Sequence, residues 1–114
     1  MKTIYFTVTN ELVYDQRMIR ICGTLSLQNY EVVLVGRQFK EAATLQPHPF
    51  RQVRLYCWFT KGKLLYVEFN IRLLFYLLFK KMDVLCAIDL DTILPCYIVS
   101  KFKSIPRIYD AHEL

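Results

Sequence analysis

The chain has 114 residues, of which 54% are hydrophobic and 22% charged, and its formal net charge is +5. This length predicts one domain with a core of its own, and the composition excludes an intrinsically disordered chain. The longest apolar runs, Leu73–Phe79 and Ile93–Val99, are far shorter than the ~20 residues that span a bilayer, which excludes a transmembrane helix.

The amino terminus and the cysteines favour a reducing compartment. Met1–Phe6 is basic and then apolar, but Thr7 interrupts the apolar run and no small-residue cleavage site follows, so it predicts a first strand and not a signal peptide. The cysteines occur singly in apolar runs, without a CxxC pair, which predicts buried free thiols. We therefore expect a cytoplasmic protein.

The first half of the chain alternates strands with a helix and a long connection. Thr3–Thr9 is rich in β-branched and aromatic residues and predicts a strand. Asp15 is a good N-cap, and apolar residues then recur at helical spacing up to Asn29, which can adopt the left-handed conformation that ends a helix. Glu31–Val35 predicts a strand covered on both faces, whereas Gln52–Phe59 alternates apolar and polar residues, as an edge strand does.

The second predicted helix, Tyr66–Lys81, is apolar almost all round. Glu68 and Arg72 stand one turn apart on it and predict an ion pair. Asp83–Ile88 then predicts a buried strand.

A third helix and a fifth strand complete the pattern. Thr92 can cap a helix that runs to about Lys103, with Pro95 in its first turn, where the missing N–H has little effect. Arg107–Tyr109 predicts the fifth strand. Strands that alternate with helices indicate a parallel sheet, and right-handed crossovers give an α/β, doubly wound, Rossmann-like fold with strand order 3-2-1-4-5 over residues 1–114.

Polar side chains follow strands 1, 4 and 5 of this predicted sheet at the points where the strands end. Ligands of open parallel sheets bind outside the carboxyl ends of the strands, where the strand order reverses. We therefore expect a substrate site built from Asn10, Asp15, Arg17, Asp89, Asp91, Asp110, His112 and Glu113.

His112 is the strongest candidate for a catalytic residue in this site. Histidine titrates near neutral pH, and the acidic neighbours of His112 can raise its pKa or fix its tautomer. The alternatives are an idle surface histidine and, for Asp15 and Asp91, simple helix capping. Asp89, Asp91 and His112 are weak evidence for a metal, so no metal site is predicted. The chain also lacks a G-x-G-x-x-G motif, which argues against an NAD site.

The chain resembles the amino-terminal domain of group 1 (family 4) glycosyltransferases of the GT-B type in three successive segments: VTNELVYDQRMIRICGTLSLQNYEVVLVGR, AIDLDTILPCYIVSK and RIYDAHE. The resemblance covers essentially the whole chain. It is closest to the sub-group common in bacterial polysaccharide and cell-surface synthesis.

The resemblance implies the acceptor-side half of a retaining, metal-independent sugar transferase with two Rossmann-like domains. His112 matches a histidine that commonly contacts the transferred sugar, and Asp89 and Asp91 match the position after strand 4. The loop at Thr9–Glu11 departs from the family, whose glycines it lacks. The donor would be a nucleotide-sugar co-substrate bound mainly by a second domain that is missing here. The first domain would also lack its last strands, so we expect no activity from this part alone.

The partners implied are a saccharide or lipid-linked acceptor and the donor-binding domain, with no nucleic acid. Peripheral contact with an anionic inner membrane face through Tyr66–Lys81 and its basic end is one role for that helix. Burial against the sheet and the second domain is the interpretation that we favour.

The alternative function is a non-catalytic Rossmann-like module that binds an anionic partner through the basic region 51–81. From residue 51 to residue 83 of the sequence, only Glu68 and Asp83 oppose the cations. An ordinary solvated face is the simpler interpretation. The basic residues are Arg51, Arg54, Lys61, Lys63, Arg72, Lys80 and Lys81.

Overall fold

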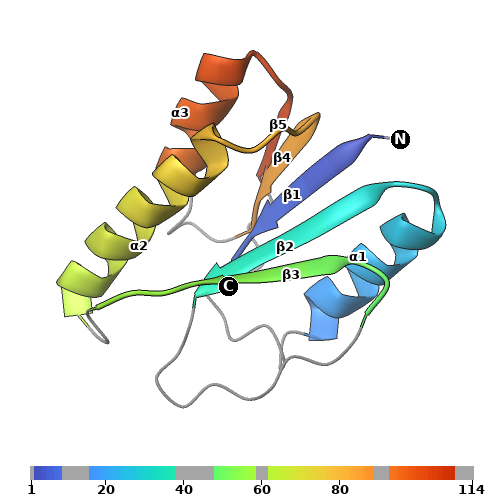
Figure 1. The fold of residues 1–114 in the computed structure, drawn as a ribbon, viewed down its shortest axis with the longest axis horizontal. Coiled ribbons are helices and arrows are strands. Elements are labelled where there is room, and N and C mark those ends of the chain that lie inside the picture. The colour runs from blue at the N-terminus through green and yellow to red at the C-terminus, as the bar shows by residue number, and fades with distance from the viewer. Residues whose placement is uncertain (1, 9–15, 38–47, 59–61, 89–92, 110–114) are drawn as a thin grey trace.

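A five-stranded parallel sheet runs through the middle of the molecule, with helices on both of its faces (Figure 1). The computed structural model describes residues 2–8, 16–37, 48–58, 62–88 and 93–109. The strand order is β3-β2-β1-β4-β5, and the neighbouring strands pair in parallel. The predicted Rossmann-like, doubly wound α/β fold and its strand order are therefore confirmed.

The elements follow one another along the chain as the sequence predicts. They are β1 (Thr3–Thr7), α1 (Gln16–Leu27), β2 (Glu31–Arg37), β3 (Arg51–Leu55), α2 (Gly62–Leu78), β4 (Val84–Ala87), α3 (Ile93–Lys103) and β5 (Arg107–Tyr109).

Three predicted boundaries of β3 and α2 are wrong: the end of the strand and both ends of the helix. The strand predicted to reach Phe59 ends at Leu55, because its neighbour in the sheet, β2, ends opposite Leu55 at Arg37. The second helix begins at Gly62 rather than at residue 66, and it ends at Leu78 rather than at Lys81. Leu65 lies in the core, where it starts a series of buried residues four positions apart, so the chain is already helical there.

Alternate residues of the strands build a separate core on each face of the sheet. One core packs α2 and α3 against odd-numbered residues such as Tyr5 and Val33. The other packs α1 against even-numbered residues such as Phe6 and Leu34. The side-chain period of two in a strand produces this division. None of the helices in the described ranges is long and apolar enough to cross a membrane.

Two of the helices end in left-handed residues that are not glycine. Asn29 has φ 70° after α1, as the sequence predicts, and Ser104 has φ 56° after α3. In both turns a backbone N–H reaches back five residues, from Tyr30 to the Leu25 carbonyl at 3.2 Å and from Ile105 to the Ser100 carbonyl at 3.1 Å. These are the bonds of the Schellman motif, which satisfies the free carbonyls of a helix end.

Candidate functional site at the carboxyl edge of the sheet

The last described residues of β1, β4 and β5 lie abreast at the carboxyl edge of the sheet. Thr7 pairs with Ala87, and Ala87 pairs with Tyr109, so one row crosses the three strands. The Ile88 N–H donates to the Thr7 carbonyl at 3.1 Å and keeps β1 and β4 in register up to the edge. The sheet thus confirms the predicted adjacency of strands 1, 4 and 5.

Most of the predicted site residues lie outside the described part of the chain. Of the predicted site residues, Arg17 lies in the part of the chain that the structure describes. It is the second residue of α1 and is half-buried. The others follow β1, β4 or β5 in the sequence, in the segments 9–15, 89–92 and 110–114. They are Asn10, Asp15, Asp89, Asp91, Asp110, His112 and Glu113.

Helices also begin at this edge, because each right-handed crossover returns the chain from a carboxyl end. α1 begins at Gln16, α2 at Gly62 and α3 at Ile93. Pro95 lies in the first turn of α3, as predicted, and is buried there. The free N–H groups and the macrodipole of a helix amino end favour negatively charged groups, phosphates among them.

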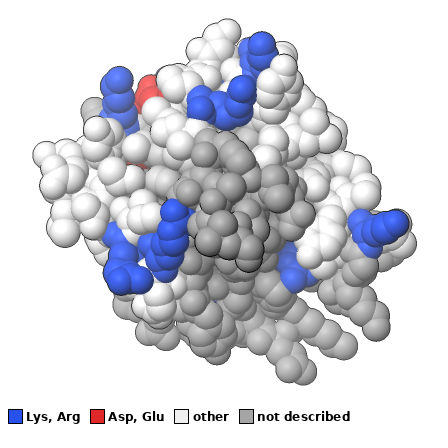
Figure 2. All heavy atoms as spheres, turned by 180° about the vertical axis from the view of Figure 1, so that it is seen from behind, with Lys and Arg blue, Asp and Glu red and all other residues white. Residues whose placement is uncertain are grey.

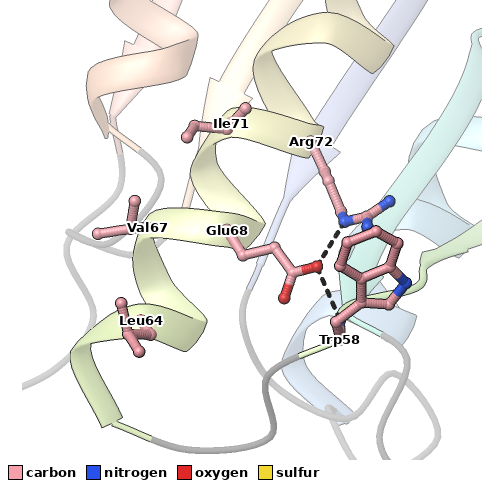
Figure 3. A pocket seen from close by; sticks show the side chains of 6 residues that line it. All are labelled: Trp58, Leu64, Val67, Glu68, Ile71 and Arg72. Atoms are coloured by element: carbon pink, nitrogen blue, oxygen red, sulfur yellow. Dashed lines mark hydrogen bonds and ion pairs between the residues drawn. The ribbon is translucent and has the colours of Figure 1, made fainter.

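A hollow with a volume of about 360 Å³ lies beside the first turns of α2. Leu64, Val67 and Ile71 line it along the helix, and Figure 3 shows Glu68 and Arg72 reaching from the helix toward Trp58. The lining is thus apolar, with a charged pair at its rim. Trp58 is 75% exposed.

Glu68 joins the two sides of this hollow. Its Oε2 accepts the Trp58 backbone N–H at 2.7 Å and the Arg72 Nε–H at 2.8 Å, and its side chain is only 11% exposed. The Arg72 guanidinium lies 5.2 Å from the centroid of the Trp58 ring, a cation–π distance. The predicted Glu68–Arg72 pair is confirmed. Its contact with Trp58 was not predicted, because a strand through residue 58 would have directed that N–H to a neighbouring strand.

The thiols near this edge are poor nucleophiles. Thr7 Oγ1 and Cys96 Sγ are 3.3 Å apart in the core, and burial raises the pKa of the Cys96 thiol to about 11. Burial, followed by the nearby Glu68 carboxylate, also raises the pKa of Cys57. Nucleophilic cysteines need the thiolate, so these two residues are structural at neutral pH. The prediction of buried free thiols is confirmed for Cys22, Cys57, Cys86 and Cys96.

The described cations of the basic region 51–81 do not form one patch. Arg51 begins β3 at the amino edge, where its guanidinium lies 4.0 Å from Glu31, and Lys80 and Lys81 follow the end of α2 near that edge. Lys63 lies at the other end of this 17-residue helix, about 25 Å away. On the face shown in Figure 2, Lys and Arg side chains likewise form separate groups.

Clusters of metal-ligand side chains are also absent from the described residues: no three His, Cys, Asp or Glu side chains there could hold an ion. The weak candidate set of Asp89, Asp91 and His112 falls outside the described ranges.

The fold and this edge define a Rossmann-like α/β domain. Among solved structures, the chain is similar to the C-terminal domain of a hydrogenase from Pyrococcus furiosus, with a TM-score of 0.73 and 13% sequence identity over 96% of this chain and 90% of that one. At this identity the likeness shows the fold alone. No protein-family model and no curated protein matches the sequence.

Proposed function

We propose that the chain is the acceptor-side half of a retaining glycosyltransferase that moves a sugar from a nucleotide-sugar donor to a saccharide or lipid-linked acceptor. The observation that carries this proposal is the row formed by Thr7, Ala87 and Tyr109. It supports a single site because the segments rich in ionisable residues continue from three neighbouring strand ends. The sequence resemblance to the glycosyltransferase family supplies the reaction.

In this proposal His112 contacts the transferred sugar, and Asp89, Asp91, Asp110 and Glu113 orient hydroxyl groups. Sugar transfer develops positive charge at the anomeric carbon, which carboxylates and a hydrogen-bonding imidazole stabilise. Asn10, Asp15 and Arg17 contribute from the loop after β1 and the first turn of α1. The helix amino ends at this edge favour the phosphates of the donor.

The proposal includes a second, donor-binding domain as the partner in catalysis, and no activity without it. It assigns the protein to the cytoplasm, with peripheral contact at the inner membrane face. In this proposal the apolar part of a lipid-linked acceptor contacts the apolar hollow beside Trp58.

Binding to the chain itself tests the acceptor site. Titration of the isotopically labelled chain with a panel of monosaccharides should shift backbone amide resonances in segments 9–15, 89–92 and 110–114. Uridine diphosphate should shift them little, because the donor binds mainly to the other domain. Strong nucleotide binding with no response to any saccharide would contradict the acceptor-side assignment.

His112→Ala, with His48→Ala as its matched control, tests the catalytic assignment. His48 precedes β3, at the end of that strand away from the carboxyl edge, and stacks on Phe50 with 5.0 Å between ring centroids. His112→Ala should abolish the saccharide response and lower transfer by about 10²–10³-fold in protein completed by the donor-binding domain. His48→Ala should leave both unchanged. Equal effects of the two substitutions would refute the role of His112.

A further inference from the structure

The outer side of the α2–α3 layer is apolar, although it faces away from the sheet. Buried residues of α2 recur as Leu65, Phe69, Leu73 and Leu77, and they pack on the sheet. The opposite side of the helix exposes Leu64, Val67, Ile71 and Phe75, and Phe79 is exposed just after the helix ends. A helix of 3.6 residues per turn places these two series on opposite sides.

α3 repeats this pattern beside α2. The two helices contact each other on one face of the sheet (Figure 1). α3 buries Cys96 and Val99 and exposes Leu94, Ile98 and Phe102, which lie one turn apart from one another. We call the exposed apolar side chains of both helices, together, the outer apolar face. Its phenylalanines at 79 and 102 are 83% and 78% exposed.

Cations lie at both ends of this face. Lys63 lies at the start of α2, Lys80 and Lys81 follow its end, and Lys101 and Lys103 occupy the last turn of α3. Because α2 and α3 both run from the carboxyl edge to the amino edge, the last four of these lysines lie at the same end of the layer.

Few acidic residues oppose these cations: Asp83, two residues after Lys81, is exposed and accepts the Thr3 backbone N–H. Among the described residues of α2 and α3, Glu68 is the one acidic side chain, and it is paired with Arg72. A tyrosine accompanies one of these lysines: Lys101 Nζ lies 5.6 Å from the Tyr97 ring centroid. Tyr76, which Lys80 contacts at 5.1 Å, packs toward the sheet and is not part of the outer face.

The sequence alone favours burial of α2 against the sheet and a second domain, but the sheet leaves this apolar face exposed and lysines lie at its ends. We therefore infer that the outer apolar face docks on an anionic lipid bilayer surface. Aliphatic and phenylalanine side chains insert at the boundary between headgroups and acyl chains, and lysines at their margin pair with anionic headgroups. Tyrosine and lysine are suited to this margin, since each has an apolar body and a polar end. Protein interfaces are instead depleted of lysine. The inference specifies the membrane contact in the proposed function but is independent of sugar transfer.

Trp58 provides the first measurement, because it is the only tryptophan of the chain and lies beside Leu64 and Val67. Vesicles of phosphatidylcholine with about a third phosphatidylglycerol should blue-shift its emission, and added salt should reverse the shift. Pure phosphatidylcholine should bind at least about tenfold more weakly. Absence of binding to the anionic vesicles at low ionic strength overturns the inference.

Matched variants test the surface itself. The double variant Phe79→Ser/Phe102→Ser should weaken vesicle binding about tenfold or more. Leu27→Ser, at a residue 79% exposed on α1 in the opposite layer, should leave binding unchanged. Lys80→Glu/Lys101→Glu should also weaken binding about tenfold or more, whereas Arg20→Glu on α1 should not. Equal losses in test and control variants overturn the inference.

Light scattering and thermal melting test whether a second copy of the chain, or the core of the domain, uses these side chains instead of a bilayer. A parent chain that dimerises, and that Phe79→Ser/Phe102→Ser converts to a monomer, would mean that a protein copy covers the face, which overturns the inference. Melting of this double variant well below Leu27→Ser would likewise overturn it, since the side chains would then belong to the core. A chain that binds vesicles but no saccharide would leave this inference standing and refute the proposed transfer function.

Discussion

α1 and α2 cover opposite faces of one sheet and differ in their outer sides. α1 buries Met18 and Cys22, and its exposed positions are mainly polar, Leu27 at its end being the large apolar exception. α2 buries one apolar series and exposes another. Both helices therefore bury an apolar inner side against the sheet, but only α1 has a mainly polar outer side, as expected for a surface in contact with water.

The inner sides of the helices stabilise the fold, whereas the apolar outer side of α2 is available to bind something else. The inner side of each helix buries apolar area against the sheet, which stabilises the domain by roughly 25 cal/mol per Å². An apolar outer side contributes nothing to that stability in water, so it is expected only where a further surface covers it. Substitutions on the two sides of a helix should therefore differ in their effect on stability.

Substitution of phenylalanine should lower stability strongly on the inner side of α2 and hardly at all on its outer side. Phe69 is fully buried, so Phe69→Ala should lower the free energy of unfolding by about 3–5 kcal/mol through lost burial and the cavity that remains. Phe75 is 56% exposed on the same helix, and Phe75→Ala should change stability by no more than about 0.5 kcal/mol. Urea denaturation of both variants measures this. A large loss for Phe75→Ala would mean that the outer side is part of the core.

The inner side of α3 should make stability depend on alkaline pH through Cys96. Burial raises the pKa of this thiol from 9.0 to about 11, so the folded state retains a proton that the unfolded state releases. Its contribution is fully present below pH 9 and is lost as the pH rises to 11, by roughly 2–3 kcal/mol.

Denaturation of parent and Cys96→Ala between pH 8 and pH 11 isolates this effect. The raised pKa values of Tyr5 and Tyr76, due mainly to burial, act in both proteins and cancel in the comparison. The parent should lose more stability with pH than the variant does. Parallel curves would refute the raised thiol pKa.

Glu68 joins the inner and outer sides of α2, and its loss should be intermediate in size. Glu68→Gln removes the charge that accepts from both Arg72 and the Trp58 N–H, and should lower stability by about 1–3 kcal/mol. Glu31→Gln is the control: its 4.0 Å contact with Arg51 is exposed and is worth at most about 1 kcal/mol. A shift of Trp58 emission in Glu68→Gln, but not in Glu31→Gln, would show that Trp58 has lost its contact with residue 68.

The fold could be predicted from the sequence where the pattern of apolar residues reflects burial in one of the two layers. Elements whose periodicity reflects burial were predicted correctly, including β2 and β4 as strands covered on both faces. The end of β3 was wrong because the strand depends on its partner, and nothing local in Gln52–Phe59 shows that β2 ends opposite Leu55.

The candidate site was predictable only in part. The adjacency of the strands that end at Thr7, Ala87 and Tyr109 follows from strand order, which the βαβ pattern predicts. The hollow at Trp58 was missed because it depends on side-chain packing between residues ten positions apart. An exposed tryptophan just after an edge strand is the sequence feature that could have indicated it.

The smallest expected effects are at the carboxyl ends of α1 and α3, which lie in opposite layers but end in the same left-handed turn. Asn29 and Ser104 both have positive φ, a conformation that asparagine adopts more readily than serine. Ser104→Gly should therefore raise stability by up to about 1 kcal/mol, and Asn29→Gly should raise it less. Lys101→Gly, inside α3, should instead lower stability by about 0.5–1 kcal/mol.

Thermal melts of these three variants measure the difference. If Ser104→Gly and Lys101→Gly both lower the melting temperature, the left-handed conformation at Ser104 is not an intrinsic strain of the α3 end. The ends of α1 and α3 would then be stabilised by different contacts, although their backbone hydrogen bonds are the same. A gain at Ser104 with a smaller gain at Asn29 would show that both layers end a helix with the same left-handed turn.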